Sequence, residues 1–247
     1  MNFTNNSAVV SGGASGLGKA CVQYLKEQGM MVASWDKQQD ESSMADVLVL
    51  CDVTSEESVE KALQQTIEKI GIPRVCVNCA GIAPAKRILG KAGVMPLAAF
   101  KQVIDVNLIG TFNVMRVLAQ AMSTLELDPD SQERGVIINT ASIAAYDGQI
   151  GQTAYSASKG AIVAMSLPAA RELAREAIRV NAIAPGLFGT PLLLEMPQAV
   201  QEGLIATLNF PKRLGKPEEF AVLVGHIIQN SMINGTTIRL DGGIRMQ

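Results

Sequence analysis

Short apolar runs alternate along this chain with longer stretches in which apolar residues recur every three or four positions. The short runs are typical of buried strands, and the longer stretches are typical of amphipathic helices. Strands that are hidden on both faces read as near-continuous apolar runs, so the alternation predicts a parallel sheet with helices on both sides. The expected strands cover residues 8–11, 31–35, 47–51, 74–78, 136–141, 179–184 and 237–240.

The alternation continues along residues 1–247 without a linker or a low-complexity tract. Right-handed crossovers make such a sheet doubly wound, and we therefore expect a single α/β domain of the Rossmann type. Residues 188–214 stand apart because they are apolar, contain three prolines and follow the carboxyl end of an expected strand. Open α/β sheets bind ligands at that edge, so this stretch is either a substrate lid or ordinary helical packing.

Composition limits the possible partners. The chain is 48% hydrophobic and 18% charged with a formal net charge of -2, which predicts a folded protein and suggests surface hidden in subunit contacts. This balance offers no broad electrostatic footprint for nucleic acid or for an anionic membrane. The sequence shows no membrane-spanning apolar run, and its first residues do not resemble a targeting segment, so we expect a cytoplasmic protein.

Histidine and cysteine usage narrows the chemistry. The chain has one histidine, His226, which excludes a zinc site built from several imidazoles. His226 lies in an apolar helical stretch, residues 220–229, and is interpreted as structural. Cys76 and Cys79 form a CxxC, but residues three apart in a strand point to opposite faces, whereas a redox pair normally opens a helix. We therefore expect neither a redox pair nor a metal site.

A glycine-rich turn follows the first expected strand. Gly12, Gly16 and Gly18 come directly after residues 8–11 and run into a helical stretch at 19–28. Such glycines permit a tight turn, a close approach of backbone to a pyrophosphate and close helix packing, while the helix N-terminus favours the anion. A glycine-rich turn alone is weak evidence of a nucleotide site, but its position between strand and helix predicts a dinucleotide site.

The second expected strand ends in Asp36, about twenty residues after Gly16, where an acid can meet the adenosine ribose. A carboxylate there accepts hydrogen bonds from the ribose hydroxyls and repels a 2′-phosphate, which favours NAD over NADP. The neighbouring Lys37 can partly offset that repulsion, and both residues also fit a simple charged turn. Asp52 is placed to meet the adenine, and the small residues of 78–81 let a flat cofactor lie close.

The proton chemistry that histidine cannot supply is available from another set. Ser142 follows the fifth expected strand, and Tyr155 and Lys159 share one face of the next helix because they are four residues apart. A tyrosine has an ordinary pKa of about 10, but a lysine ammonium and a cationic nicotinamide both favour the phenolate. Tyr155 can then take a proton from an alcohol as hydride leaves its carbon. Alone, the pair also fits a packing aromatic and a solvated lysine.

Together these motifs resemble the short-chain dehydrogenase/reductase family over nearly the whole chain. Ser11 stands where the family's glycine motif has threonine, and Cys79 replaces the second asparagine of its NNAG motif. The resemblance implies that Ser142 orients the substrate oxygen, that Tyr155 is the acid/base, and that Lys159 binds the nicotinamide ribose and lowers the tyrosine pKa. Asn107 matches the fourth catalytic residue, which holds a water that connects the lysine to solvent.

The resemblance also implies a set of contact residues. The substrate contacts are Ser142, Gln152 and Tyr155. The contacts with NAD are Gly12, Ser15, Gly16, Leu17, Gly18, Asp36, Asp52, Val53, Asn78, Cys79, Ala80, Gly81, Tyr155, Lys159, Pro185, Gly186, Phe188 and Thr190.

Four further segments, residues 135–142, 148–152, 184–193 and 239–246, are similar to family members that act on acyl-CoA. The activity implied is NAD-dependent oxidation of a 3-hydroxyacyl-CoA to the 3-oxoacyl-CoA in fatty acid metabolism. Residues 82–100 are longer than in most family members. Three basic residues there can either meet CoA phosphates or belong to a solvated loop: Lys86, Arg87 and Lys91.

Three alternatives stay open. The first is an NADPH-dependent reductase of 3-oxoacyl-[acyl carrier protein] or acetoacetyl-CoA. The second is a hydroxysteroid or other secondary alcohol dehydrogenase, and the third is an NAD-binding scaffold without turnover. The helical stretch 155–174 is rich in small residues and fits the homotetramer usual in the family, although its own subunit can also cover it.

Overall fold

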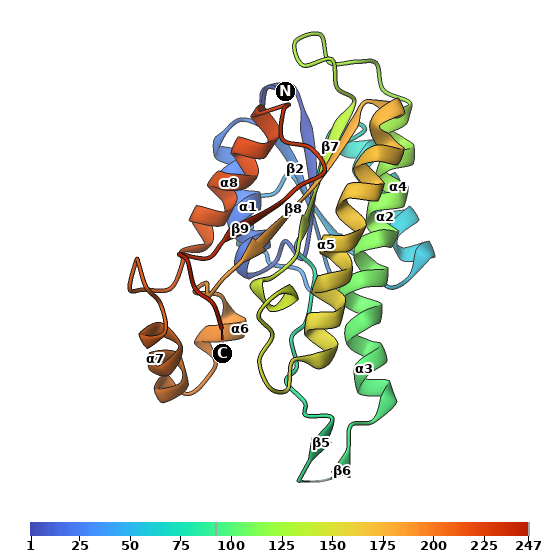
Figure 1. Ribbon diagram of the computed structural model, residues 1–247. Helices are drawn as coiled ribbons and strands as arrows, with labels where there is room; N and C mark the ends of the chain where they lie inside the picture. Colours follow the sequence, from blue (N-terminus) through green and yellow to red (C-terminus); the bar gives the residue numbers. More distant parts are fainter. Residues whose placement is uncertain (92, 247) are drawn as a thin grey trace.

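A computed structural model describes residues 1–91 and 93–246, and its centre is a parallel sheet of seven strands (Figure 1). The strand order is β3-β2-β1-β4-β7-β8-β9. A small antiparallel pair, Leu89–Gly90 (β5) and Gly93–Val94 (β6), projects from one end of the molecule. The sheet strands are Ser7–Ser11 (β1), Met31–Asp36 (β2), Val47–Leu50 (β3), Val75–Asn78 (β4), Gly135–Thr140 (β7), Ile178–Pro185 (β8) and Thr237–Leu240 (β9).

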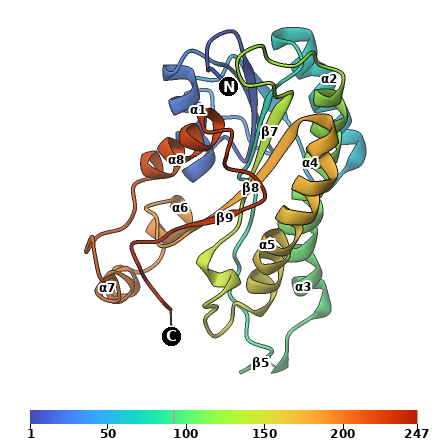
Figure 2. The same cartoon turned by 45° about the horizontal axis from the view of Figure 1, so that its top comes forward.

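Helices cover both faces of the sheet (Figure 2). Helices α1 (Gly16–Glu27) and α8 (Pro217–Gln229) pack on one face, and α2 (Glu56–Ile70), α4 (Gly110–Ser123) and α5 (Thr153–Leu173) pack on the other. Successive strand residues enter opposite cores, as Ala8 and Val10 face α1 and α8 while Val9 faces the second layer. The expected doubly wound α/β domain is confirmed.

The observed elements lie close to the predicted ones. Every sheet strand was predicted with its ends within one residue. The first helix differs, because it begins at Gly16 rather than at residue 19. The sequence argument assigned Gly16 and Gly18 to the phosphate-binding turn before the helix, whereas the structure includes both in the first helical turn.

The stretch 188–214 forms two short helices, α6 (Pro191–Leu194) and α7 (Gln198–Ala206), which project from the body beside the C-terminal end of the chain (Figures 1 and 2). No residue of α7 is buried. This peripheral position is compatible with the lid expected from the sequence, and the movement of a lid remains a prediction.

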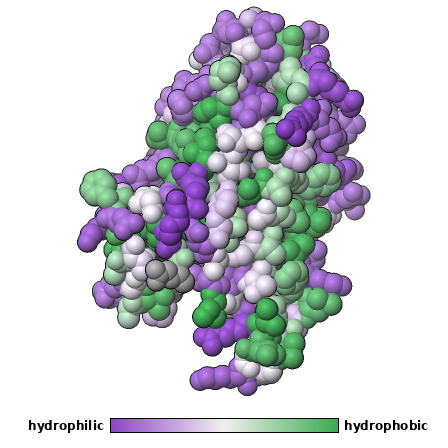
Figure 3. All heavy atoms as spheres, in the orientation of Figure 1, coloured by the Kyte–Doolittle hydropathy of each residue, from purple (hydrophilic) through white to green (hydrophobic). Residues whose placement is uncertain are grey.

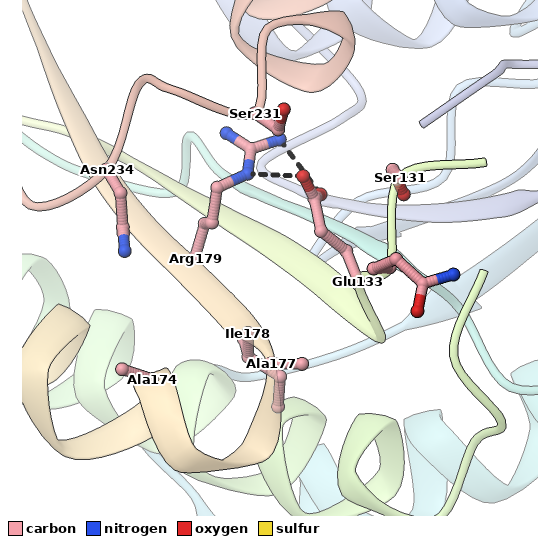
Figure 4. Close-up of a pocket in the computed structure, with 9 residues that line it drawn as sticks. Ser131, Glu133, Ala174, Ala177, Ile178, Arg179, Ser231 and Asn234 are labelled. Carbon is pink, nitrogen blue, oxygen red and sulfur yellow. Dashed lines mark hydrogen bonds and ion pairs between the residues drawn. The ribbon is translucent and has the colours of Figure 1, made fainter. Parts of the chain in front are cut away.

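A buried ion pair lies at the amino end of the sheet (Figure 4). Arg179, near the start of β8, meets Glu133 with 3.1 Å between Nε and Oε1, and their side chains are 6% and 8% exposed. The guanidinium also donates to the carbonyls of Ile227, Ile228 and Ile233 at 2.8–3.0 Å. The pair lines a cavity of 240 Å³, and its bonds join β8 to the end of α8. Arg179 therefore holds β8 against the end of α8.

The CxxC residues lie as the strand register requires. Cys76 is buried in the core that contains α2 and α4, while Cys79 packs against the opposite core. Both are free cysteines. Among the described residues there is no cluster of histidine, cysteine and carboxylate side chains suited to a metal ion, and no helix that is long and apolar enough to cross a membrane.

Candidate active site

The glycine-rich turn brings β1, β4 and α1 into close contact. Gly12 has φ +69°, and a Cβ there would lie 2.6 Å from the backbone nitrogen of Ala80. A Cβ on Gly18 would clash with the carbonyl of Gly12, so only glycine permits this packing. Ser15 is exposed at the start of α1 and makes no side-chain capping bond with the described residues. The free N-terminus of α1 is therefore a suitable place for a phosphate group.

Asp36 ends β2 beside this turn. Its Oδ2 accepts a hydrogen bond from the backbone N–H of Ala14 at 3.1 Å, and its Oδ1 accepts one from Gln38 at 3.2 Å. These bonds fix the carboxylate next to the glycine turn, where the sequence predicted the acid that meets the adenosine ribose.

Asp52 forms an ion pair with Lys37, the residue that was expected to weaken the repulsion between Asp36 and a 2′-phosphate. The Lys37 Nζ lies 3.0 Å from the Asp52 Oδ2, so its charge is matched by this carboxylate. Burial pushes the pKa of Asp52 upward, but two hydrogen bonds from Thr54 and the Lys37 contact outweigh it, and the net shift is downward. Asp52 is therefore ionised at neutral pH. Val53 is buried beside it, and its carbonyl accepts a bond from the Asn113 side chain at 2.9 Å.

A polar ladder crosses the ends of three strands. The Ser11 hydroxyl donates to the Asn78 Oδ1 at 3.1 Å, and the Asn78 Nδ2 donates to the Asn139 Oδ1 at 2.9 Å. Asn78 is 2% exposed, so its side chain joins strands and is not available to a ligand. The expected contact of Asn78 with the cofactor stays a prediction that falls to its backbone, while its side chain positions the small residues that follow, Cys79, Ala80 and Gly81.

Lys159 is a buried cation without a carboxylate partner among the described residues. Its side chain donates from Nζ to the carbonyl of Thr140 at 2.7 Å, and the residue is 5% exposed. Burial lowers the pKa of Lys159 to about 8, and the Cys79 thiol opposes this shift. The Nζ lies 5.8 Å from the centre of the Tyr155 ring, so the two side chains share one side of α5 as predicted.

Burial sets the direction of the Tyr155 pKa. Burial raises this pKa, and the Ser142 hydroxyl opposes the shift without reversing it. Lys159 is not among the groups that shift the pKa of Tyr155. The expectation that Lys159 and an oxidised nicotinamide together favour the phenolate stays a prediction, in which the positive charge of the nicotinamide would act in the opposite direction to burial.

Ser142 and Gln152 flank the loop between β7 and α5. Ser142 is 7% exposed, and its hydroxyl accepts a bond from the Ala144 N–H at 3.1 Å. Gln152 precedes α5, and its Oε1 accepts a bond from the Gln149 N–H at 2.9 Å. The loop that carries Ser142 toward Tyr155 is thus held by its own side chains.

Asn107 lies in a π-helical turn, Asp105–Ile109, between α3 (Leu97–Ile104) and α4. Such turns are frequent at functional sites. The Asn107 side chain accepts from the Ile82 N–H at 2.8 Å and donates to the Ser158 hydroxyl at 3.0 Å. It therefore connects the segment after β4 with the helix that carries Lys159.

The segment after β8 completes the cofactor side. A Cβ on Gly186 would lie 2.8 Å from the Asp241 Cα, and Thr190 lies against Gly16. The Phe188 ring packs edge-on against Phe220 and is 7% exposed. This ring belongs to the core, so only the backbone of Phe188 remains for the expected contact. Leu17 is partly buried against the same core, and Pro185 ends β8.

Sequence reasoning missed two participants. The Thr140 carbonyl holds Lys159, and a backbone group leaves no signal in the sequence. Ser158 accepts from Asn107 and donates to the Tyr155 carbonyl at 2.7 Å. Its position between Tyr155 and Lys159 was the one available hint.

Comparison with known proteins agrees with this arrangement. Residues 12–245 match the family described as enoyl-(acyl carrier protein) reductase. The chain is 52% identical to 3-hydroxyacyl-CoA dehydrogenase type-2 of Bos taurus over 97% of this chain and 95% of that protein. This chain belongs to the short-chain dehydrogenase/reductase family. Oxidoreductases of this family use nicotinamide cofactors.

Two further relatives widen the comparison. The crystal structure of 3-hydroxyacyl-CoA dehydrogenase type-2 from Mycobacterium avium has a TM-score of 0.90 and 39% identity, and covers 98% of this chain and 97% of that one. The 3-oxoacyl-[acyl-carrier-protein] reductase FabG of Thermotoga maritima is 30% identical over 99% of both chains. Proteins named as dehydrogenases and as reductases are thus both similar to this chain over nearly its whole length.

Proposed function

We propose that this protein oxidises 3-hydroxyacyl-CoA to 3-oxoacyl-CoA with NAD. One observation carries the proposal: Lys159 is a buried ammonium held by a carbonyl, and it lies 5.8 Å from the ring of Tyr155, on which the Ser142 hydroxyl acts. An uncompensated charge is costly to bury and is usually retained for chemistry. The identity of 52% to a 3-hydroxyacyl-CoA dehydrogenase type-2 supports this substrate over the acyl carrier protein.

The residues present fit a bound NAD. The glycine contacts at positions 12 and 18, the uncapped start of α1 and the fixed Asp36 carboxylate supply a pyrophosphate cradle and a ribose partner. Since Lys37 is paired with Asp52, it does not offset the repulsion between the Asp36 carboxylate and a 2′-phosphate. When bound, the nicotinamide supplies the hydride acceptor.

The catalytic side chains then divide the work on the alcohol. The Ser142 hydroxyl orients the substrate oxygen, and the Tyr155 phenolate takes the proton of the substrate hydroxyl. The Lys159 ammonium stabilises the phenolate and would hold the nicotinamide ribose by a hydrogen bond. Asn107 positions Ser158 and the segment after β4. In the proposed proton path Asn107 would hold a water that connects Lys159 to solvent.

An exposed apolar surface is available for contact with a second subunit. Figure 3 shows hydrophobic side chains gathered along the face over α4 and α5. Phe112 on α4 and Leu167 on α5 are 48% and 43% exposed. Burial of such side chains against a partner helix supports the homotetramer expected from the family.

Steady-state kinetics test the proposal. Wild-type protein is assayed with 3-hydroxybutyryl-CoA and either NAD or NADP, and with a hydroxysteroid as the competing alcohol. We expect NADH formation with the thioester and a clear preference for NAD. Oxidation of the steroid without oxidation of the thioester would reject the substrate, and a strong preference for NADP would support the reductase alternative instead.

A further inference from the structure

A second cavity, of 430 Å³, lies where α7 meets the segment after β9, residues 241–246. Figure 1 shows α6, α7 and the C-terminal end of the chain side by side, below the carboxyl end of β9. The volume lies in the range of small-molecule sites. The residues that line the cavity are Gln149, Leu204, Thr207, Asn209, Gly243, Arg245 and Met246.

This cavity adjoins the proposed catalytic groups. Ile143, the residue after Ser142, is buried in one cluster with Leu208 and Ile244, and Met246 packs against that cluster. On the other side, Gln149 is bonded to Gln152, which directly precedes the helix of Tyr155. The cavity and the catalytic loop therefore share walls.

Arg239 on β9 holds these walls together. Its Nη2 donates to the Asp147 Oδ2 at 2.7 Å, and its Nε donates to the Asp241 Oδ2 at 2.6 Å. The guanidinium also lies 5.0 Å from the centre of the Tyr146 ring. Because Asp147 is in the catalytic loop and Asp241 begins the segment after β9, one side chain fixes both.

Arg245 is the only charged residue among those that line the cavity. Its side chain is 60% exposed, and its Nη1 contacts the Asp241 Oδ2 at 3.3 Å and the Ile244 carbonyl at 2.7 Å. Its Nε and Nη2 donate to none of the described residues. Asp241 is 9% exposed and is already bonded to Arg239, so the free part of the Arg245 fork is oriented and available for an anion.

The other lining groups suit a neutral, amide-bearing chain. Gln149 and Asn209 contribute side-chain amides, Thr207 contributes a hydroxyl, and Leu204 and Met246 are apolar. Amide groups match the peptide-like bonds of a pantetheine arm, and a guanidinium fork matches a phosphate. We propose that this cavity binds the pantetheine arm of the CoA thioester and that Arg245 contacts its phosphate. The proposal rests on the proposed function.

Two substrates that differ in phosphate test it. Wild type and Arg245→Gln are assayed with 3-hydroxybutyryl-CoA and with 3-hydroxybutyryl-pantetheine, which lacks phosphate. We expect Arg245→Gln to raise the KM for the CoA thioester about tenfold, as for loss of a hydrogen bond to a charged group, with kcat unchanged. The KM for the pantetheine thioester should not change, and Arg245→Lys should restore part of the affinity because it keeps the charge.

Arg175→Gln is the matched control. Arg175 is also an exposed arginine in a surface ion pair, but it lies after α5 at the opposite edge of the sheet. We expect the same KM as wild type for both thioesters with this variant. The KM for the CoA thioester should rise with salt in wild type and less steeply in Arg245→Gln, since screening weakens a phosphate contact.

Binding of free CoA separates the two proposals. Isothermal titration with CoA and with pantetheine, in the presence of NAD, measures the contact without turnover. Wild type should bind CoA more tightly, and Arg245→Gln should remove that difference. Equal losses for both thioesters, or no loss for CoA, would overturn the role of Arg245. If wild type oxidises neither thioester, the proposed function fails, and the titration still decides whether Arg245 binds the phosphate.

Discussion

Two buried cations lie at opposite ends of the strands of the same sheet, and their surroundings differ. At the amino end, Arg179 is paired with Glu133 and donates to three backbone carbonyls. At the carboxyl end, Lys159 donates to the Thr140 carbonyl and has no carboxylate partner among the described residues. A compensated charge can join elements of a fold, whereas an uncompensated one is retained against a desolvation cost. The comparison separates a structural cation from one that we assign to chemistry.

The largest expected effect is a loss of kcat on removal of the Tyr155 hydroxyl. Tyr155→Phe keeps the ring and removes the hydroxyl, so we expect kcat with 3-hydroxybutyryl-CoA to fall by about a thousandfold or more. Equilibrium dialysis should show NAD binding close to that of wild type. Full activity of this variant with intact NAD binding would show that another group transfers the proton.

The structural cation should behave in the opposite way. Arg179→Leu leaves the Glu133 carboxylate buried without its partner, and we expect a loss of about 3 kcal/mol in the free energy of unfolding. Urea unfolding at fixed protein concentration measures this loss. The kcat of the folded fraction should stay near wild type, because Arg179 lies at the end away from Tyr155.

Glu133→Gln is the milder partner variant of this pair. It keeps the shape and one hydrogen bond, and it should cost less stability than Arg179→Leu. A large decrease of kcat in folded Arg179→Leu would remove the distinction between the two ends.

Asp36 is expected to give a smaller, selective effect. Asp36→Asn removes the charge beside the glycine turn while keeping the acceptor for the Ala14 N–H, so the preference for NAD over NADP should fall by about tenfold. The ratio of kcat/KM for the two cofactors measures it. Lys37→Gln is the control, and an unchanged ratio in Asp36→Asn would remove Asp36 from cofactor selection.

His226 should give no effect on catalysis. It is exposed on α8, and its carbonyl accepts the helix-ending bond from Asn230 at 2.9 Å. His226→Gln keeps this backbone bond, so the pH dependence of kcat/KM should match wild type. A folded variant with a shifted pH profile would place the histidine in the proton path.

Part of this arrangement could be predicted from the sequence. The apolar runs located the strands, and the spacing of Tyr155 and Lys159 placed them together, because helix geometry fixes which residues share a face. The ion pair of Arg179 with Glu133 could not be predicted, since the two residues are 46 positions apart and come together only in the fold. The upward pKa shift of Tyr155 was also missed, because burial is a property of the whole packing.

The contribution of Lys159 to the free energy of unfolding depends on pH. Burial holds the pKa of Lys159 at about 8 in the folded protein, below the ordinary value of 10.5. At a pH between these two pKa values, the unfolded chain binds more protons at Lys159 than the folded protein does. The Lys159 contribution to stability is therefore unfavourable below pH 8 and disappears as the pH rises toward 10.5.

The most direct test of this account is the free energy of unfolding of wild type and Lys159→Met as a function of pH, with kcat measured on the same samples. We expect the variant to be inactive yet more stable at pH 7 by about 2 kcal/mol, with the difference shrinking as the pH is raised above the Lys159 pKa. A variant that is less stable than wild type at pH 7, or a difference that does not depend on pH, would contradict the claim that this charge is buried at a cost for the sake of Tyr155.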